Sequence, residues 1–180
     1  MTQAAQPVEV AEYDPVWPRR FVEERERIAA ALGDGDVVIE HIGSTAVPGL
    51  PAKPVIDILV GVDDIERSGQ AVAALIGLGY SYAPEVETDV PDQRYFYKGS
   101  PHTHHVHMVE RSSRMFDEHL LFRDYLRAHP EAADEYARLK RGLAARFRDD
   151  RASYTRGKKT FFDTVVAAAR RARAAGAPPH

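Results

Sequence analysis

The sequence predicts an α+β fold in which helices flank a small mixed sheet. Two β-branched runs, at 37–42 and 55–60, are typical of strands. Three shorter runs, at 80–83, 93–98 and 104–110, predict further strands. From about residue 112 onward the apolar residues recur at helical spacing instead. A mixed α/β region followed by helices alone indicates one sheet with helices packed over it.

The first helix is predicted to begin at Asp14, an N-cap residue followed by proline, and to end at Gly33. A second helix is predicted from Asp63 or Asp64 to about residue 78. The later helices are predicted at 112–128, 130–148 and 153–175.

Length and composition indicate one globular domain. A chain of 180 residues forms one well-buried core, and 44% hydrophobic with 28% charged residues is an ordinary globular balance. We expect a single domain over 1–180, with an ordered core at about 13–175 and flexible ends at 1–10 and 176–180. The sequence has no cysteine, no secretory leader pattern and no membrane-spanning apolar run, which favours a cytoplasmic protein that does not contact a membrane.

The connection between the first two strands is the strongest candidate for a ligand site. The strand ends at Gly43, Ser44 and Thr45, where a glycine lets the backbone approach a ligand and hydroxyls can hold phosphate oxygens. An isolated Gly-Ser is more often a plain turn, but this loop is long and stiffened by prolines. His41 is a further candidate for phosphate binding. Because strand residues alternate, either His41 or Glu40 faces the cleft, and the sequence does not decide which.

Asp57 is a lone acid within the apolar second strand. A buried carboxylate is costly unless it is paired or coordinated, so we expect Asp57 to face a cleft that contains a cation, a hydroxyl or Lys53. A functional carboxylate is favoured over a structural one.

His105 and His107 lie two residues apart on a predicted strand, so both face the same side. They are candidates for acid and base catalysis, for phosphate contact, or for a metal site shared with Asp57. Hydrogen-bonded structural histidines are the alternative.

Lys53, Arg94 and Lys158 are candidate phosphate partners, because guanidinium and ammonium groups suit phosphate oxygens. Lys158 lies four residues after Tyr154, so the two are expected to share a helix face. Residues 138–173 hold twelve lysines and arginines but only three aspartates. A solvated helix face explains this excess better than nucleic-acid binding, which we consider unlikely.

Three motifs resemble those of the GrpB family. They are His-Ile-Gly-Ser-Thr-Ala-Val-Pro-Gly-Leu at 41–50, Lys-Pro at 53–54 and Ile-Asp-Ile at 56–58. The resemblance extends from the Tyr13 region, through the histidines at 104–107, to Tyr154, Lys158 and the phenylalanine pair at 161–162.

This family is similar to the nucleotidyltransferase superfamily, so the resemblance implies a nucleotidyltransferase-like fold with C-terminal helices. It also implies phosphate binding by the Gly-Ser turn and Mg²⁺ or Mn²⁺ held by strand carboxylates. Leu59 stands where the superfamily carries a second acid. Family members also resemble modules joined to dephospho-coenzyme A kinase.

Three functions are therefore to be compared. The first is a cleft for a nucleotide or phosphorylated small molecule that supports metal-dependent nucleotidyl or phosphoryl transfer. The second is a noncatalytic nucleotide-binding or regulatory module that has lost the second carboxylate. The third and weakest is a nucleic-acid binder that uses the basic C-terminal helices. A homodimer formed through an exposed sheet edge is possible in each case.

Overall fold

The computed structural model describes residues 7–33, 37–88 and 92–176. Its centre is a five-stranded mixed sheet in the order β1-β2-β5-β4-β3. The strands are β1 (Val38–Ile42), β2 (Ile56–Val62), β3 (Ser81–Tyr82), β4 (Gln93–Lys98) and β5 (His104–Glu110). The pair β2 and β5 is parallel and the other three pairs are antiparallel. The predicted α+β class is confirmed.

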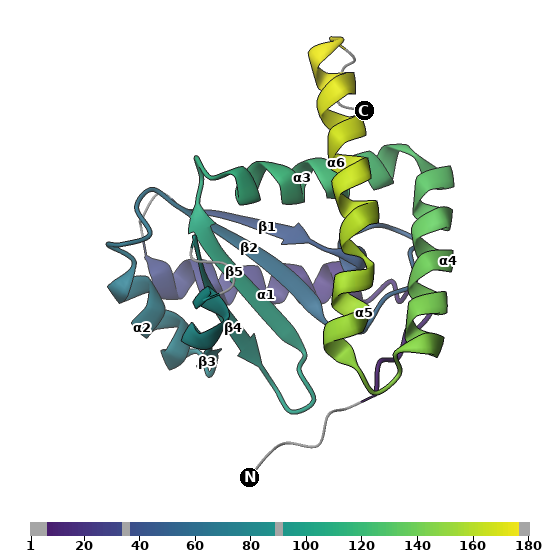
Figure 1. The fold of residues 1–180 in the computed structure, drawn as a ribbon. Helices are drawn as coiled ribbons and strands as arrows, with labels where there is room; N and C mark the ends of the chain where they lie inside the picture. Colours follow the sequence, from purple (N-terminus) through teal and green to yellow (C-terminus); the bar gives the residue numbers. More distant parts are fainter. Residues whose placement is uncertain (1–6, 34–36, 89–91, 177–180) are drawn as a thin grey trace.

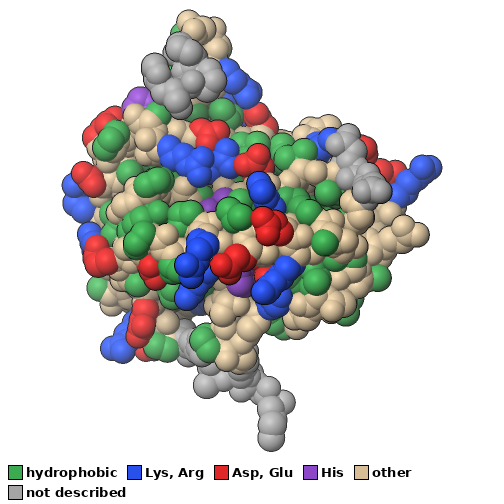
Figure 2. Space-filling view, turned by 180° about the vertical axis from the view of Figure 1, so that it is seen from behind, with side chains coloured by type: hydrophobic (Ala, Val, Ile, Leu, Met, Phe, Trp, Pro, Cys, Tyr) green, Lys and Arg blue, Asp and Glu red, His purple; other side chains and the backbone are tan. Residues whose placement is uncertain are grey.

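Helices cover both faces of the sheet (Figure 1). The helices are α1 (Trp17–Leu32), α2 (Gly69–Gly77), α3 (Arg114–Ala128), α4 (Pro130–Arg146), α5 (Arg151–Gly157) and α6 (Lys159–Ala174), with short 3-10 turns η1 (Ser44–Ala46) and η2 (Pro84–Thr88). The helices α1 and α2 lie on one face, where Ile28 and Leu75 pack against Ile58 and Phe96. Basic and acidic side chains are interspersed over that side of the molecule (Figure 2).

The opposite face of the sheet packs against α3, through Ile42, Leu59 and Val109. A separate apolar cluster joins α3, α4 and α6 to the loop after β1, where Val47 and Leu50 are buried. The last three helices therefore stand beside the end of β1, as Figure 1 shows. This arrangement places the Gly-Ser loop between the sheet and the helical part of the chain.

Three predicted helices differ from the structure. The first begins at Trp17, with Val16 and not Asp14 as its N-cap, because the Asp14 carboxylate accepts the amide of Val16 in a turn before the helix. The helix predicted from Asp63 or Asp64 begins only at Gly69, because the Asp64 carboxylate accepts the amides of Glu66 and Arg67 and so forms a local turn first. The helix predicted at 153–175 is divided at Lys158, whose amide bonds to the carbonyl of Thr155, three residues back.

The ends of the chain are described in part. Val8 lies in the segment predicted to be flexible, yet it is buried and its amide donates to the carbonyl of Arg148 at 2.7 Å. Residues 1–6 and 177–180 of the predicted flexible ends lie outside the described residues. Within the described parts, no helix has the length and apolar character needed to cross a bilayer.

Candidate functional site

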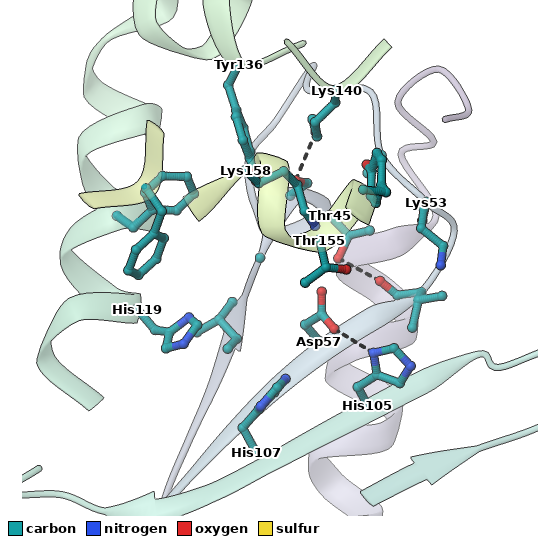
Figure 3. Close-up of a pocket in the computed structure, with 18 of the residues that line it drawn as sticks. Thr45, Lys53, Asp57, His105, His107, His119, Tyr136, Lys140, Thr155 and Lys158 are labelled. Carbon is teal, nitrogen blue, oxygen red and sulfur yellow. Dashed lines mark hydrogen bonds and ion pairs between the residues drawn. The ribbon is translucent and has the colours of Figure 1, made fainter. Parts of the chain in front are cut away.

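A cavity of about 430 Å³ lies where the loop after β1, the faces of β2 and β5, and the helices α3 to α6 meet (Figure 3). Most of the predicted site residues line it. They are Gly43, Ser44, Thr45, Lys53, Asp57, His105, His107 and Lys158. These eight residues come from four separate segments of the chain, and the fold brings them together at one cavity.

Gly43 allows the loop to pass directly over Asp57. Its φ is +72°, and a Cβ atom there would lie 2.5 Å from Oδ2 of Asp57. The positive φ and the short distance to Asp57 therefore both exclude a larger residue at position 43. The consequence is that Ser44 and Thr45 are held at the cavity wall beside the Asp57 carboxylate.

His41 lies behind this loop and does not line the cavity, so the prediction that it binds phosphate directly is wrong. It pairs with Ile58, on the face covered by α1, and stacks on Phe21 with 4.6 Å between ring centroids. Its Nε2 lies 3.0 Å from the Thr45 hydroxyl, which in turn donates to the carbonyl of Val55. Burial lowers the pKa of His41 to about 4, so a neutral imidazole positions Thr45.

Asp57 is paired with a histidine. Its Oδ1 lies 3.0 Å from Nδ1 of His105, the residue opposite it in the parallel β2 and β5 register. Burial by itself would raise the pKa of Asp57, but the hydrogen bond and charge of His105, with His107 and Lys158, lower it to about 2. Asp57 is therefore ionised across the physiological pH range.

The two histidines share a face as predicted, and both have partners. The second ring nitrogen of His105, Nε2, lies 3.2 Å from Nδ1 of His102. Nδ1 of His107 lies 3.0 Å from Oε1 of Gln93, so it carries a proton and donates it. Burial lowers the pKa of His107 to about 3, which keeps this imidazole neutral.

These donors do not fit a two-metal centre. Leu59 is fully buried against Ile42 and Val109 and does not line the cavity. Glu40 is held by Arg123, and Glu110 accepts the amide of Ile65, so neither supplies the second carboxylate. No group of three or more His, Cys, Asp or Glu within the described ranges is arranged to hold a metal ion. Magnesium prefers several oxygen ligands, and Asp57 offers one carboxylate.

Cations dominate the cavity wall. Five lysines and arginines line the cavity, whereas Asp57 is the one carboxylate among the described lining residues; the five are Lys53, Lys140, Arg151, Lys158 and Lys159. Burial, followed by Arg151 and Lys158, lowers the pKa of Lys53 to about 8. Burial also lowers the pKa of Lys158, although Asp57 acts in the opposite direction. The ammonium of Lys158 lies 4.6 Å from the centroid of the Tyr154 ring, so the two side chains meet although Lys158 follows the end of α5.

Sequence reasoning missed Lys140 and His119, which also line the cavity. Lys140 follows Tyr136 and Ala137 on the buried face of α4, and a lysine at such a position is the signal that could have revealed it. His119 comes from α3 and faces His107, with 5.9 Å between ring centroids. The sequence did not indicate that these positions of α3 and α4 lie close to β2.

Arg94 does not belong to the site, so its prediction as a phosphate partner is wrong. It pairs with Met108 in the antiparallel register of β4 and β5, while its neighbour Tyr95 pairs with His107. The Arg94 side chain therefore lies on the opposite face from the cavity, where it bonds to Glu66 at 3.3 Å.

Several cations of the basic C-terminal segment pair with carboxylates. Arg173 and Arg170 contact Asp117 on α3, and Lys159 contacts Asp163 one turn along its own helix. Arg141 contacts Glu12 near the N-terminus. These pairs balance part of the positive charge that the sequence concentrates in this segment.

Comparison with known proteins gives consistent family matches. A family model described as GrpB protein matches residues 7–168. UPF0157 protein YqkA of Bacillus subtilis is 43% identical over 165 residues, which cover 91% of this chain and 48% of that protein. UPF0157 protein PA4798 of Pseudomonas aeruginosa is 46% identical, over 89% of this chain and 65% of that protein. The chain thus spans about half of the first relative and just under two thirds of the second.

A protein named dephospho-CoA kinase from Mycolicibacterium paratuberculosis is 31% identical over 88% of this chain, in a match that covers 45% of that protein. Among solved structures, conserved protein GrpB from Enterococcus faecalis has a TM-score of 0.81 and 37% identity, over 89% of this chain and 96% of that one. Cid1 poly(U) polymerase has a TM-score of 0.50 and 12% identity, over 76% of this chain and 44% of that one. The second likeness shows a nucleotidyltransferase-like fold and no more.

Proposed function

The chain belongs to the GrpB family, and we propose that its cavity binds the phosphate groups of a nucleotide or another phosphorylated small molecule. The observation that carries this proposal is the composition of the cavity wall, where five lysines and arginines stand against one carboxylate. Buried cations without partners are costly, and an anionic ligand would remove that cost.

The loop supports the same proposal. The hydroxyls of Ser44 and Thr45 lie beside the cations, and Gly43 brings the backbone within reach of a ligand. Lys53 and Lys158 flank Asp57 from the loop before β2 and from the start of α6 (Figure 3). Point charges of this kind suit phosphate oxygens, and the cavity volume of about 430 Å³ lies within the range of small-molecule pockets.

Metal-dependent nucleotidyl or phosphoryl transfer is less well supported than binding, because it requires several carboxylates and the cavity offers Asp57 alone. The proposal is therefore a binding site that needs no metal ion. It is compatible with the noncatalytic module inferred from the sequence. The relative named dephospho-CoA kinase makes dephospho-coenzyme A one of the phosphorylated molecules to be tested.

The decisive experiment is calorimetric titration of the wild-type protein and of Asp57→Asn with tripolyphosphate, the four nucleoside triphosphates and dephospho-coenzyme A, without metal and with Mg²⁺ or Mn²⁺. Asparagine keeps an oxygen that can accept from His105 but removes the negative charge. We expect metal-free binding to the wild type, and binding about tenfold tighter in Asp57→Asn because one repulsive charge near the phosphate is gone.

A loss of affinity in Asp57→Asn would overturn the proposal. Binding that requires Mg²⁺ or Mn²⁺ and is lost in Asp57→Asn would mean that a metal ion held by Asp57, and not the lysines, neutralises the phosphates. That outcome would favour metal-dependent transfer. Absence of binding for every ligand, with and without metal, would exclude a phosphate site altogether.

A further inference from the structure

Lys140 is the most deeply buried cation in the described part of the chain. Its exposed fraction is 2%, and no described carboxylate lies within ion-pair distance of its ammonium. The charged groups that act on it most are Lys158 and Arg141, both of them cations. The Tyr136 ring, 4.7 Å from Nζ, offers only weak compensation. The surroundings of Lys140 therefore favour a neutral amine.

The Nζ atom of Lys140 has two hydrogen-bond partners. It donates to the carbonyl of Pro51, and it lies 2.9 Å from Oγ of Ser44. A neutral amine that donates to Pro51 keeps a lone pair, which can accept the Ser44 hydroxyl proton. Ser44 lies in η1, just after β1, and lines the cavity together with Lys140, which is labelled in Figure 3.

The neighbouring hydroxyl is arranged differently. Thr45 Oγ1 donates its proton to the carbonyl of Val55 and lies 3.0 Å from Nε2 of His41. Its proton is therefore committed to a backbone acceptor. Ser44 is thus the loop hydroxyl that has an amine as a partner, beside the Tyr136 hydroxyl, with which it also shares a hydrogen bond.

We propose that Ser44 is a nucleophile and Lys140 its general base, and that the site accepts a phosphoryl or nucleotidyl group from a phosphoanhydride. This inference rests on the proposed phosphate binding, because Lys53, Lys158 and Arg151 would hold the phosphate oxygens while Lys140 serves the hydroxyl. Serine and lysine pairs are a known variant of the serine, histidine and aspartate arrangement.

The step balances without any further reactant. The Ser44 hydroxyl proton moves to Nζ of Lys140, the bond from Oγ to phosphorus forms, and the bridging bond from phosphorus to oxygen breaks. The leaving group departs as a phosphate, pyrophosphate or nucleotide anion, and the ammonium of Lys140 can return its proton to that anion or to water. The product is a phosphate ester on Ser44.

The first test uses a small fluorophosphonate, in which Oγ attacks phosphorus and fluoride leaves, so that no knowledge of the natural ligand is needed. Intact-mass measurement and peptide mapping would follow labelling of the wild type from pH 5 to 10. We expect one adduct at Ser44, whose rate rises through a midpoint near pH 7, where burial places the pKa of Lys140. Removal of a general base typically slows such a step by about 100-fold or more.

Three variants complete this test. Ser44→Ala should give no adduct. Lys140→Arg places a permanent cation at the same position and has no base near neutral pH, so its labelling should fall by at least about 100-fold even though the site gains positive charge. Arg138→Met, which removes an exposed cation from the same helix, should label at the wild-type rate. No adduct at Ser44, or equal rates in the wild type and Lys140→Arg, would overturn the proposal.

The second test identifies the substrate class. Wild type and Ser44→Ala would be incubated with ATP labelled at the α or at the γ phosphate, with unlabelled tripolyphosphate as a competitor. If Ser44 retains label from the γ phosphate, the reaction is phosphoryl transfer. If it retains label from the α phosphate, the reaction is nucleotidyl transfer. A wild type that binds these ligands by calorimetry but never acquires label would overturn this inference and leave the proposed binding intact. A wild type that neither binds nor labels would overturn both.

Discussion

Lys98, which is half-buried, and Lys140, which is buried, lie on opposite sides of the same sheet, and their surroundings differ in charge. On the α1 face, Lys98 donates to the buried carboxylate of Glu24 at 2.8 Å, and the Tyr80 hydroxyl donates to the same group at 3.0 Å. On the cavity face, Lys140 contacts Ser44 and the Pro51 carbonyl, with no carboxylate. We refer to these groups as the Lys98 cluster and the Lys140 cluster.

The difference indicates which of the two sites is made for a ligand. The Lys98 cluster contains its own counter-charge, and the hydrogen bonds from Lys98 and Tyr80 lower the pKa of Glu24 although burial acts against them. It is complete within the folded chain. The Lys140 cluster lacks a counter-charge and opens to the cavity. The same fold pairs Lys98 with a carboxylate but leaves Lys140 without one, and this contrast indicates that the Lys140 cluster has a function.

The largest expected effect concerns the Lys98 cluster. Glu24→Gln leaves the ammonium of Lys98 without its counter-charge, and removing one partner of a buried pair costs about 3 kcal/mol of unfolding free energy. Urea unfolding at pH 7 would measure this loss. The matched control is Glu23→Gln on the exposed side of α1, which should change stability by less than about 0.5 kcal/mol. A loss below about 1 kcal/mol in Glu24→Gln would remove the contrast between the two clusters.

A substitution in the Lys140 cluster should change the free energy of unfolding in the opposite direction. Lys140→Met replaces a buried amine with an apolar side chain of similar length, so the ligand-free variant is expected to be more stable than the wild type at pH 6. The pKa of Lys140 is about 7 in the folded protein and 10.5 ordinarily, so between these values the unfolded chain binds more protons and wild-type stability rises with pH.

The gap between Lys140→Met and the wild type should therefore narrow above pH 7. One proton gives at most about 1.4 kcal/mol per pH unit, so we expect the gap to shrink by about 2 kcal/mol between pH 7 and pH 9. Urea unfolding of both proteins at pH 6, 7, 8 and 9 would measure it, with Arg138→Met as the control. A gap independent of pH would show that Lys140 stays charged in the folded protein.

The third effect concerns ligand affinity. Lys53→Met and Lys158→Met should each weaken tripolyphosphate binding about tenfold, or about 1.4 kcal/mol, because each removes one partly desolvated cation from the phosphate site. Arg27→Met removes an exposed cation from the α1 face and should leave affinity within about twofold, since screening by salt weakens distant charges. Equal losses in all three variants would mean that net charge alone governs binding.

The affinity for tripolyphosphate should also depend on pH. A bound anion favours the charged form of Lys53, whose pKa is about 8 in the free protein, so binding takes up a proton above that pH. The wild-type affinity should fall from pH 7 to pH 9, and Lys53→Met should show a smaller fall. Calorimetry in two buffers of different ionisation enthalpy would measure the proton uptake directly.

Local patterns were sufficient to predict most of the fold. Alternation in 104–110 placed His105 and His107 together, and β-branched runs located β1 and β2 to within two residues at each end. The division of the last helix at Lys158 was not predictable, because it depends on tertiary packing. A Cβ atom at Gly157 would lie 2.5 Å from Cδ2 of Leu143, which shows how closely α5 approaches α4 at this point.

The candidate site was predictable where its residues form short local motifs. Gly43 to Asp57 form one local motif, whereas Lys140 and His119 enter from helices whose position depends on the packing of Val47 and Leu50. The sequence did not decide whether His41 faces the cavity, because strand alternation defines two faces but does not show which of them the helices leave open. Arg94 was misassigned for the same reason.

Arg94 therefore gives the smallest expected effect, and the sharpest test of the division between the two faces. Its guanidinium lies on the α1 and α2 side and bonds to the exposed carboxylate of Glu66. Arg94→Met should change tripolyphosphate affinity by less than about 0.5 kcal/mol, because the sheet separates this charge from the cavity. Lys158→Met, measured beside it, removes the same charge on the other face. If both variants weakened binding equally, the phosphate would have to lie elsewhere, and the charge imbalance of the Lys140 cluster would need a different explanation.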